Sequence, residues 1–515
     1  MTKNWLADLD QDTENLDPKS REVLQRLLNY LEDLYSQNLE LKADNQRLRD
    51  EIAALKGHKG KPDIKPQAKA DTSKADTSAE AKPEQPNSRE RKKKKPKTPP
   101  QERRQLIHID REEVIKLARS NLPSDITHRG YREVTIQNII FKTDTVIYRL
   151  ERLYSPSTEK FYEAQLPQGL KGKSYGSELE AFVLTLYYQL RVPEEKILKL
   201  LPSQGIVISA GKISNLITRQ YLREFTEERN AILEAGLGST SYHQIDDTGM
   251  RVNGKNCYVF TLCNPYYSSF FTRERKNSET VLQMLNELQL DPTELAVVQS
   301  DDLVDSILPD KKKKQLGDYI DILVADDAGQ FHNQTNHRSL CWIHEGRHYE
   351  KLTPLVPSHQ KSLAQFLSYF WIYYYQLKAY QQQSTEEQRQ QKLLLETEFD
   401  KLFSRQTGYS ALDHRIDLTK QKKPYLLLVL DFPEVPLDNN EAERTVREYV
   451  IKRKISNGTR TLQGTQAWEV FLALVDTCRK NGVNFYSYIK DRISKSFKMP
   501  ALSTLIQQMQ PPKPT

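Results

Sequence analysis

Three scarcities in this 515-residue sequence narrow the class of protein it encodes. Only 4 cysteines occur, so a small fold held by disulfide bridges is not expected. No apolar run is long enough to span a bilayer and no secretory signal is recognisable, so we expect a cytoplasmic protein. The apolar fraction of 37% and the mean hydropathy of −0.71 are low for a wholly globular chain. Long solvated segments are therefore expected beside the folded domains.

The length and the charge of the chain suggest several domains and a polyanionic partner. A chain of 515 residues is too long for one compact domain, so we expect two or three domains with linkers. The formal net charge is +7 and the isoelectric point is near 8.8. This mild basic bias favours partners such as nucleic acids.

Residues 1–57 carry a heptad repeat of leucine. The d position holds Leu27, Leu34, Leu41, Leu48 and Leu55, and the a position holds Leu24, Leu31, Asn38, Asn45 and Ile52. Leucine at every d position with asparagine at two a positions is typical of a parallel two-stranded coiled coil. We therefore expect a dimerisation helix that forms a homodimer or a higher oligomer. The alternative, an amphipathic helix packed on its own domain, does not need so strict a repeat.

The next two segments differ in composition. Residues 58–104 are rich in Lys, Pro, Ala and Ser and are expected to form a disordered basic linker. The basic end of this linker either contacts DNA phosphates without specificity or is only solvated. Residues 105–170 contain alternating runs such as "VTIQNIIF" and "DTVIYRLERLY", which predict a small β-rich unit.

Residues 171–235 have a helical pattern. The run "SELEAFVLTLYYQLRV" predicts one amphipathic helix. The runs "PEEKILKLL" and "SAGKISNLITRQY" then predict a helix-turn-helix, with Ser209 as the N-cap of its second helix. Such a pair either enters a DNA major groove or is only a packing unit.

Apolar runs that end in aspartate recur in the next segment. The stretch "STSYHQIDDTGMRVNGKNCYVFTLC" predicts two strands around a turn at Asn253-Gly254, and "YYSSFFTRER" predicts a third strand. Asp246, Asp301 and Asp326 each follow such a run. Because ligands and metals gather at strand ends in α/β sheets, these acids are candidate ligands. Three strands followed by alternating helices and strands predict an α/β fold with a mixed sheet of the ribonuclease-H type.

A dense polar cluster opens the helix that "LDNNEAERTVREYV" predicts. Asp438 is a good N-cap, and Glu441, three residues later, is placed to complete a capping box. Glu443 lies about 200° around the helix from Glu441 and shares a face with Arg447. Local helix chemistry thus explains Glu441 and leaves Glu443 as the candidate ligand.

The chain resembles the transposases of the insertion sequence sixty-six family, in particular the C subunit with its DDE catalytic domain. The residues that carry the resemblance are "HQIDDTG", "ILVADD", "CWIHEGRHYEKL" and "LDNNEAERTVREYV", of which the last is the most specific. The resemblance extends from the leucine repeat to about Ile489. It implies a ribonuclease-H-like catalytic core over 236–357 and 421–495, followed by a tail over 496–515.

A helical insertion is expected to interrupt that core over residues 358–420. Its stretch "FLSYFWIYYYQLKAY" is too aromatic to be a free linker. We expect a helical subdomain packed beside the active site. The alternative is that these aromatic side chains contact DNA.

Matched residue by residue, the resemblance implies a catalytic, metal-binding triad of Asp246, Asp326 and Glu443. The identity of the second ligand stays open between Asp326, Asp327 and Asp301. Such a triad implies phosphoryl transfer assisted by two Mg²⁺ or Mn²⁺ ions. Residues expected to support the triad are Asp247, Asp327, Asn440, Cys341 and His344. The basic stretch around Glu443, which either binds flanking phosphates or is a solvated face, holds Arg444, Arg447, Lys452, Arg453 and Lys454.

The cysteine-rich zinc unit of the family has no counterpart in this sequence. The matching region, roughly Leu122 to Pro167, holds no cysteine, so we expect no structural zinc. Cys341, His344 and His348 suggest zinc as an alternative. No second cysteine pair lies nearby, and a packing or orienting role is favoured for them.

These inferences predict a DDE transposase that cleaves DNA and transfers the strands of an insertion sequence. The expected partners are the transposon ends, target DNA and a second copy of the chain, with no membrane. Accessory transposition proteins are further candidates, and a nucleoid-associated cytoplasmic location is expected. The alternative is a catalytically inactive or domesticated dimeric DNA-binding protein derived from such a transposase.

Overall fold

A computed structural model describes residues 16–55, 109, 111–115, 131–132, 134–136, 143–167, 170, 172–289 and 315–509. The chain divides into two compact units, residues 1–67 with 143–515 and residues 68–142. Every helix and strand described below belongs to the first unit. No helix in the described ranges is both long and apolar enough to cross a membrane.

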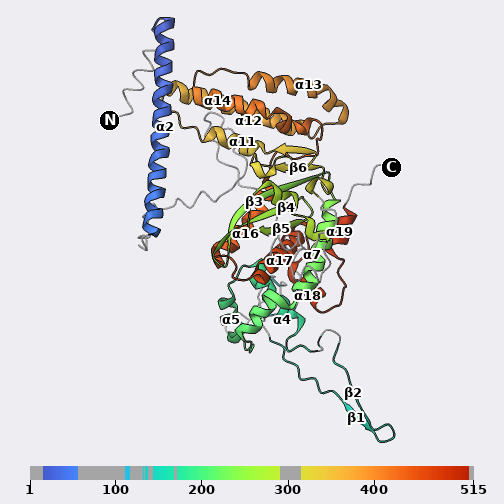
Figure 1. Ribbon diagram of the computed structural model, residues 1–515. Coiled ribbons are helices and arrows are strands. Elements are labelled where there is room, and N and C mark those ends of the chain that lie inside the picture. The colour runs from blue at the N-terminus through green and yellow to red at the C-terminus, as the bar shows by residue number, and fades with distance from the viewer. Residues whose placement is uncertain are drawn as a thin grey trace, which may run out of the picture. The chain divides into compact units, whose positions relative to one another are not determined.

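A five-stranded mixed sheet in the order β5-β4-β3-β6-β7 forms the centre of this unit (Figure 1). The strands are β3 (Tyr242–Val252), β4 (Lys255–Cys263), β5 (Ser268–Arg273), β6 (Ile322–Ala325) and β7 (His337–Leu340). β3, β4 and β5 are antiparallel, whereas β6 and β7 run parallel to β3. The three predicted strands and the turn at Asn253 and Gly254, both with positive φ, are confirmed. The predicted run that ends in Asp301 lies outside the described residues.

Helices from two parts of the chain pack on β3, β4 and β5 or on one another. They are α7 (Leu222–Leu237), α16 (Asn440–Ser456), α17 (Leu462–Lys480), α18 (Phe485–Ile493) and α19 (Leu502–Gln508). α17 is buried along most of its length and packs on β5, and α16 packs on β3 and β4. Short turns lie between β5 and β7 in the sequence: α8 (Ser278–Leu282), η4 (Asn286–Gln289), η5 (Leu316–Asp318) and η6 (Gly329–Phe331).

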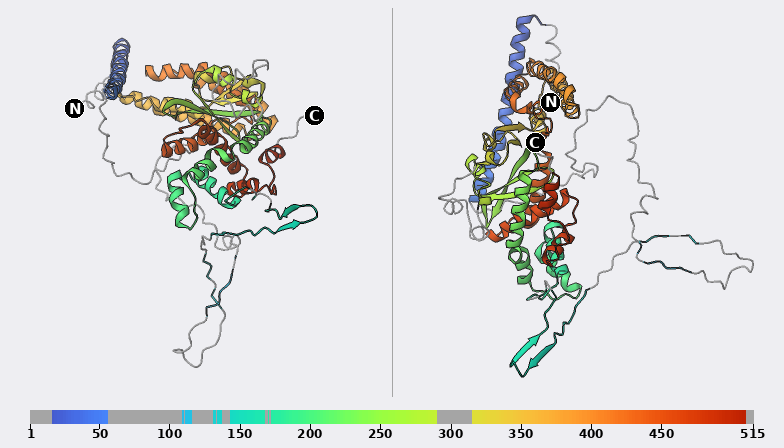
Figure 2. Two further views of the ribbon diagram at one scale, coloured as in Figure 1. Left: turned by 60° about the horizontal axis from the view of Figure 1, so that its bottom comes forward. Right: turned by 90° about the vertical axis from the view of Figure 1, so that its right-hand side faces the viewer.

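A helical subdomain separates β7 from α16 in the sequence. It consists of α11 (Trp342–Glu350), α12 (Pro357–Tyr380), α13 (Thr385–Leu402), α14 (Ser410–Gln421), α15 (Lys423–Leu426) and η7 (Leu428–Leu430). The orange helices α12, α13 and α14 lie side by side in Figures 1 and 2. Trp342 is fully buried at their centre. Its ring centroid lies 5.5–6.4 Å from those of Phe370, Tyr373, Phe399 and Phe403. These rings are core residues, so they cannot stack on DNA.

The predicted helix-turn-helix corresponds to two short helices, α5 (Glu194–Ser203) and α6 (Ala210–Asn215), and α6 continues into η3 (Leu216–Gln220). Before them lie α4 (Ser177–Leu184) and η2 (Thr185–Gln189, a π-helical turn). The hydroxyl of Ser209 accepts a hydrogen bond from the backbone N–H of Lys212 at 3.2 Å. Ser209 is therefore the N-cap of α6, as predicted. The entry of α6 into a DNA groove stays a prediction.

The leucine repeat lies on one continuous helix, α2 (Pro18–Leu55). Its d-position side chains are exposed: Leu27, Leu34, Leu41 and Leu48 have exposed fractions of 53%, 43%, 61% and 51%. A different face, roughly 120° around the helix, contacts the helical subdomain. There the carboxylate of Glu32 accepts hydrogen bonds from the N–H groups of Leu355 and Val356 and pairs with His359. The leucine seam therefore stays accessible, and dimerisation through it stays a prediction.

The predicted β-rich unit is only partly described. A hairpin of β1 (Arg152–Ser155) and β2 (Lys160–Glu163) is present, and most of its side chains are exposed. The strand predicted from "DTVIYRLERLY" is wrong in its first part, because residues 144–150 have no regular structure. Val146 and Ile147 are 53% and 82% exposed, so no packing surface holds that run in a sheet. The linker over 58–104 lies outside the described residues.

Candidate active site

The register of the sheet places two of the predicted acids side by side. β3 and β6 pair in parallel with Gln244 opposite Val324. Asp246, in the middle of β3, and Asp326, directly after β6, each lie two residues beyond that pair. Burial, and then the neighbouring charges of Asp326, Asp247 and Glu443, raise the pKa of Asp246 to about 7. The carboxylates of Asp246, Asp326 and Glu443 therefore act on one another electrostatically.

Backbone and amide contacts fix the start of α16 on β3. The side-chain amide of Asn439 donates to the carbonyl of Ile245 at 2.7 Å. The amide of Gln244 donates to the carbonyl of Asp438 at 2.9 Å and accepts from the N–H of Ala442 at 3.2 Å. Glu443, one residue after Ala442, thereby comes to the middle of β3, where Asp246 lies.

The capping box predicted for this helix is wrong. Asp438 accepts a hydrogen bond from the N–H of Asn440 at 3.2 Å, but α16 begins at Asn440 and its N-cap is Asn439. Glu441 pairs instead with Arg444 at 3.0 Å and with Lys480 at 3.7 Å. Because Gln244 reaches across from β3 to cap the first turn, the acid is not needed there. Glu441 still has a structural role, in these ion pairs.

The adjacent aspartates have their own cationic partners. Asp327 pairs with Lys422 at 2.8 Å, with His332 at 3.3 Å and with Arg338 at 3.6 Å. Burial alone would raise its pKa, but these partners, Lys422 foremost, lower the pKa of Asp327 below its usual value. Three cationic side chains would thus compete with a metal ion for this carboxylate.

Asp247 is occupied in a similar way. Its carboxylate pairs with Lys276 at 2.7 Å and accepts from the side chain of Gln330 at 2.7 Å. Within the described ranges, no cationic group lies within 4.0 Å of a carboxylate oxygen of Asp246 or Asp326. The geometry therefore favours Asp326 over Asp327 as the second ligand and leaves Asp247 in a supporting position.

Glu443 lies in a cluster with residues of α11. The two terminal guanidinium nitrogens of Arg347 donate to the carboxylate of Glu443, at 3.3 and 3.4 Å. The Nε2 of His344 is 3.6 Å from Oε1 of Glu443. The ligand atoms of Cys341, His344 and Glu443 all lie within 4.8 Å of one another. The motifs "CWIH" and "EAER" are far apart in the sequence but meet in this cluster.

Cys341 has a structural role in that cluster. Its sulfur accepts a hydrogen bond from the N–H of Asn439 at 3.3 Å, which links the start of α11 to the start of α16. Burial raises the pKa of the Cys341 thiol to about 12, so the thiol is neutral at physiological pH. A metal ion bound at this sulfur would have to displace the thiol proton.

A cavity of about 540 Å³ lies next to Asp326, with walls from α11 and α14. Its cationic lining consists of Arg347, Lys351, Arg415 and Lys422. Glu345 and Asp327 neutralise part of this charge. A cationic cavity beside acids is the arrangement that a phosphodiester needs, since cations hold the phosphate while carboxylates hold metal ions.

The basic stretch on α16 divides into exposed and buried members. Arg444, Arg447 and Lys454 are exposed and Arg453 is half-buried, so all four remain candidates for phosphate contacts.

Lys452 is the exception, and its predicted contact with DNA is wrong. Its side chain is 1% exposed, and its ammonium donates to the carbonyl of Tyr187 at 2.8 Å. The ammonium lies 3.5 Å from the ring centroid of Tyr187 and 5.0 Å from that of Trp468. Burial and then the charge of Arg191 lower the pKa of Lys452 to about 7. Its spacing of three residues from the apolar Tyr449 was the signal of a buried position.

The sequence profile of the family described as "Transposase IS66 family" matches residues 172–304 and 309–467, which is more than half of the chain. This protein belongs to the IS66 transposase family. The matched residues of this IS66 transposase include β3–β7, α16 and all three candidate acids. The match begins after α2 and the β1–β2 hairpin.

A curated relative of this IS66 transposase is the "Uncharacterized protein y4jO" of Sinorhizobium fredii. The two are 34% identical over 178 residues, which is 35% of this chain. The chain spans about half the length of that relative, 53%. The name of that relative assigns it no activity, so the functional comparison rests on the family.

Proposed function

We propose that this IS66 transposase is an active DDE enzyme that cleaves the DNA strands of its own element and joins them to a target. The observation that carries the proposal is that Asp326 and Glu443 lie near enough to Asp246 for their charges to raise its pKa. The parallel register of β3 and β6 supports the pairing of the two aspartates. The amide contacts of Gln244 and Asn439 support the placement of Glu443 beside them. The sheet order β5-β4-β3-β6-β7 fits a ribonuclease-H-like core.

Divalent ions fit the residues of this site. Asp246 and Asp326 offer hard oxygen ligands with no cationic side chain within 4.0 Å among the described residues, which suits Mg²⁺ or Mn²⁺. When bound, two such ions stabilise the attacking and the leaving oxygen of an in-line displacement at phosphorus. Asp246, Asp326 and Glu443 would hold them.

The other residues of the site have simpler tasks in this proposal. Lys351 lines the cavity beside Asp326, where it would attract and hold the phosphodiester, whereas Lys422 pairs with Asp327 and Glu345 there. The attacking oxygen, first of water and then of the freed 3′-hydroxyl, forms a new P–O bond while the P–O bond to the leaving strand breaks. Asn439 and Cys341 fix α16, so their role is to position Glu443.

A second copy of the chain is part of the proposal. The exposed leucine seam of α2 and its heptad spacing support a coiled-coil homodimer. A dimer would bring two catalytic sites to the two ends of one element.

The experiment uses the purified protein and a DNA fragment that carries the inverted repeats flanking its own gene. With Mg²⁺ we expect strand cleavage at the repeat ends and joining to a target plasmid, and neither product in EDTA. Specific binding to the repeats without cleavage in Mg²⁺ or Mn²⁺ would instead support the domesticated DNA-binding protein.

A further inference from the structure

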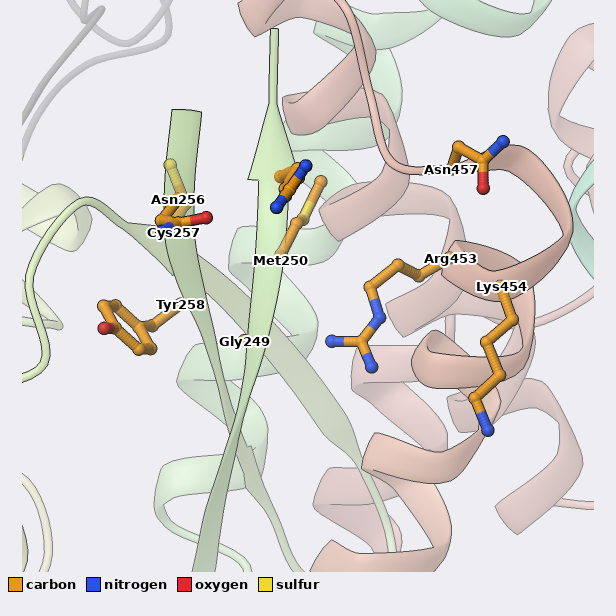
Figure 3. Close-up of a pocket in the computed structure, with 9 residues that line it drawn as sticks. Gly249, Met250, Asn256, Cys257, Tyr258, Arg453, Lys454 and Asn457 are labelled. Atoms are coloured by element: carbon orange, nitrogen blue, oxygen red, sulfur yellow. The ribbon is translucent and has the colours of Figure 1, made fainter. Parts of the chain in front are cut away.

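A second cavity, of about 570 Å³, lies at the far end of the β3–β4 hairpin (Figure 3). Its walls come from the end of β3, the start of β4 and the last turn of α16. Arg251, Asn256, Arg453, Lys454 and Asn457 contribute to the lining. Its volume is in the range of pockets that hold a small organic molecule.

The cations of this cavity lack an anionic partner among the residues that the structure describes. Within the described ranges, no carboxylate lies within 4.0 Å of the charged nitrogens of Arg251, Arg453 or Lys454. Arg453 donates to the neutral hydroxyl of Thr248 at 3.3 Å. Figure 3 shows the guanidinium of Arg453 pointing from α16 toward β3. Three uncompensated cations around one cavity favour an anionic ligand.

Two amides supplement those cations. Asn256 lies on the strand wall and Asn457 at the end of the helix, on opposite sides of Arg453 in Figure 3. Asparagine and arginine side chains are the groups that most often recognise the edges of DNA bases. Arginine, lysine and asparagine side chains also contact phosphates, and the volume of this cavity leaves room for a base beside a phosphate.

The walls of the cavity are fixed to each other. The N–H of Asn253 donates to the carbonyl of Thr459 at 2.8 Å, and the N–H of Thr459 donates to the carbonyl of Arg251 at 3.2 Å. Gly458 between them has a φ of +90°, and a Cβ there would lie 2.3 Å from the carbonyl oxygen of Arg251. Glycine at this position therefore allows α16 to end against the hairpin. A preformed pocket loses little entropy when a ligand binds.

The cavity lies along the two elements that carry the acids. It begins three residues after Asp246, roughly 10 Å along β3. Arg453 follows Glu443 by ten residues, roughly 15 Å along α16. At a rise of about 3.4 Å per stacked nucleotide, these distances correspond to about three to four nucleotides.

We propose that this cavity binds one unstacked nucleotide of the DNA strand that passes through the active site, about three to four nucleotides from the cut. Arg251 and Lys454 hold its phosphates, and Arg453 with the two asparagines contacts its base. The inference rests on the proposed function for the identity of the ligand as DNA. Binding needs no catalysis, so the two can be tested separately.

The test measures fluorescence anisotropy of labelled single strands on the full-length protein in EDTA. The probes are an oligothymidylate and an oligomer of equal length that consists of abasic nucleotides. We expect Arg251→Gln and Lys454→Gln each to weaken oligothymidylate binding about fivefold near 0.1 M salt and to reduce the salt slope by about 0.7. Lys498→Gln, which removes an exposed charge elsewhere, is the matched control and should bind as the wild type does.

The base contact has its own readout. The wild type should prefer the oligothymidylate over the abasic oligomer by about tenfold. Asn256→Ala with Asn457→Gly should lose that preference and keep the salt slope, since glycine tolerates the positive φ of Asn457. Equal binding of both probes by the wild type, or a preference that survives in the double variant, would overturn the nucleotide assignment. Normal binding here without strand cleavage in Mg²⁺ would contradict only the proposed function.

Discussion

Arg347 forms a two-pronged ion pair with Glu443, with N–O distances of 3.3 and 3.4 Å. The arginine lies on α11 and the glutamate on α16, so the pair joins the helical subdomain to the helix that carries the third acid. A carboxylate held by a guanidinium is less available to a metal ion. We infer that Arg347 neutralises Glu443 without metal and releases it when divalent ions bind.

The first prediction follows from this competition. Arg347→Gln should tighten the binding of Mn²⁺ to the DNA-free protein by about three- to tenfold, because the lost ion pair is half-exposed and contributes only about 1 kcal/mol. Titration of Mn²⁺ by electron paramagnetic resonance measures this change. Arg444→Gln removes an equal charge from the exposed face of α16 and should leave Mn²⁺ affinity close to that of the wild type. Equal affinities of the Arg347→Gln variant and the wild type would contradict the competition.

The second prediction concerns the buried amine of Lys452, whose pKa is lowered to about 7. Its unfolded pKa is about 10.4, so between these values the unfolded chain binds more protons and stability rises with pH. We expect the wild type to gain about 2 kcal/mol or more between pH 7 and pH 9, relative to Lys452→Met. Urea unfolding of both proteins at both pH values measures this gain. A constant difference between the two would mean that the aromatic rings around Lys452 keep its amine charged.

The third prediction separates the two faces of α2. Glu32 caps the start of α12, and Gln25 and Asn29 donate to the carbonyl of Gly408. We expect Glu32→Gln to release α2 from the helical subdomain, seen as faster amide exchange at Leu355 and Val356, while the protein stays dimeric. Leu34→Ala with Leu41→Ala should do the opposite, giving monomers in which those amides stay protected.

Sedimentation equilibrium and hydrogen exchange on the same samples check both halves of this prediction. A monomeric Glu32→Gln variant, or a fully dimeric double leucine variant, would contradict the separation of the two faces. Low pH should release α2 from the helical subdomain in the same way as Glu32→Gln. Burial alone would raise the pKa of Glu32, but His359 and two backbone N–H groups lower it below its usual value. The contact is therefore retained at neutral pH and lost as the pH falls through that lowered pKa.

The sequence was sufficient to predict the hairpin strands, since period-two alternation and the Asn253-Gly254 turn are local signals. The choice of Glu443 over Glu441 relied on a capping box that the structure does not contain, and Glu443 as a ligand stays a prediction. The choice between Asp326 and Asp327 needed the structure. Only the fold shows that Lys422, nearly a hundred residues away in the sequence, neutralises Asp327.

Two errors have the same physical origin. Asp438 and Glu441 have the spacing of a capping box, but Gln244 from a strand about two hundred residues earlier caps the helix. Lys452 belongs to a basic run, but Tyr187 and Trp468 from distant helices surround it. In both cases tertiary contacts override a correct local pattern.

Asp246, Asp326 and Glu443 are proposed to act together. Strand cleavage by variants in which one of these acids is replaced by its uncharged amide tests this most directly. Asp246→Asn, Asp326→Asn and Glu443→Gln should each reduce Mg²⁺-dependent cleavage of the element's own ends to background, with DNA binding in EDTA retained. Asp327→Asn and Glu441→Gln are matched controls that should cleave within a few-fold of the wild type, because those acids serve ion pairs. Near-normal cleavage by Asp326→Asn, together with loss of cleavage in Asp301→Asn, would contradict the account.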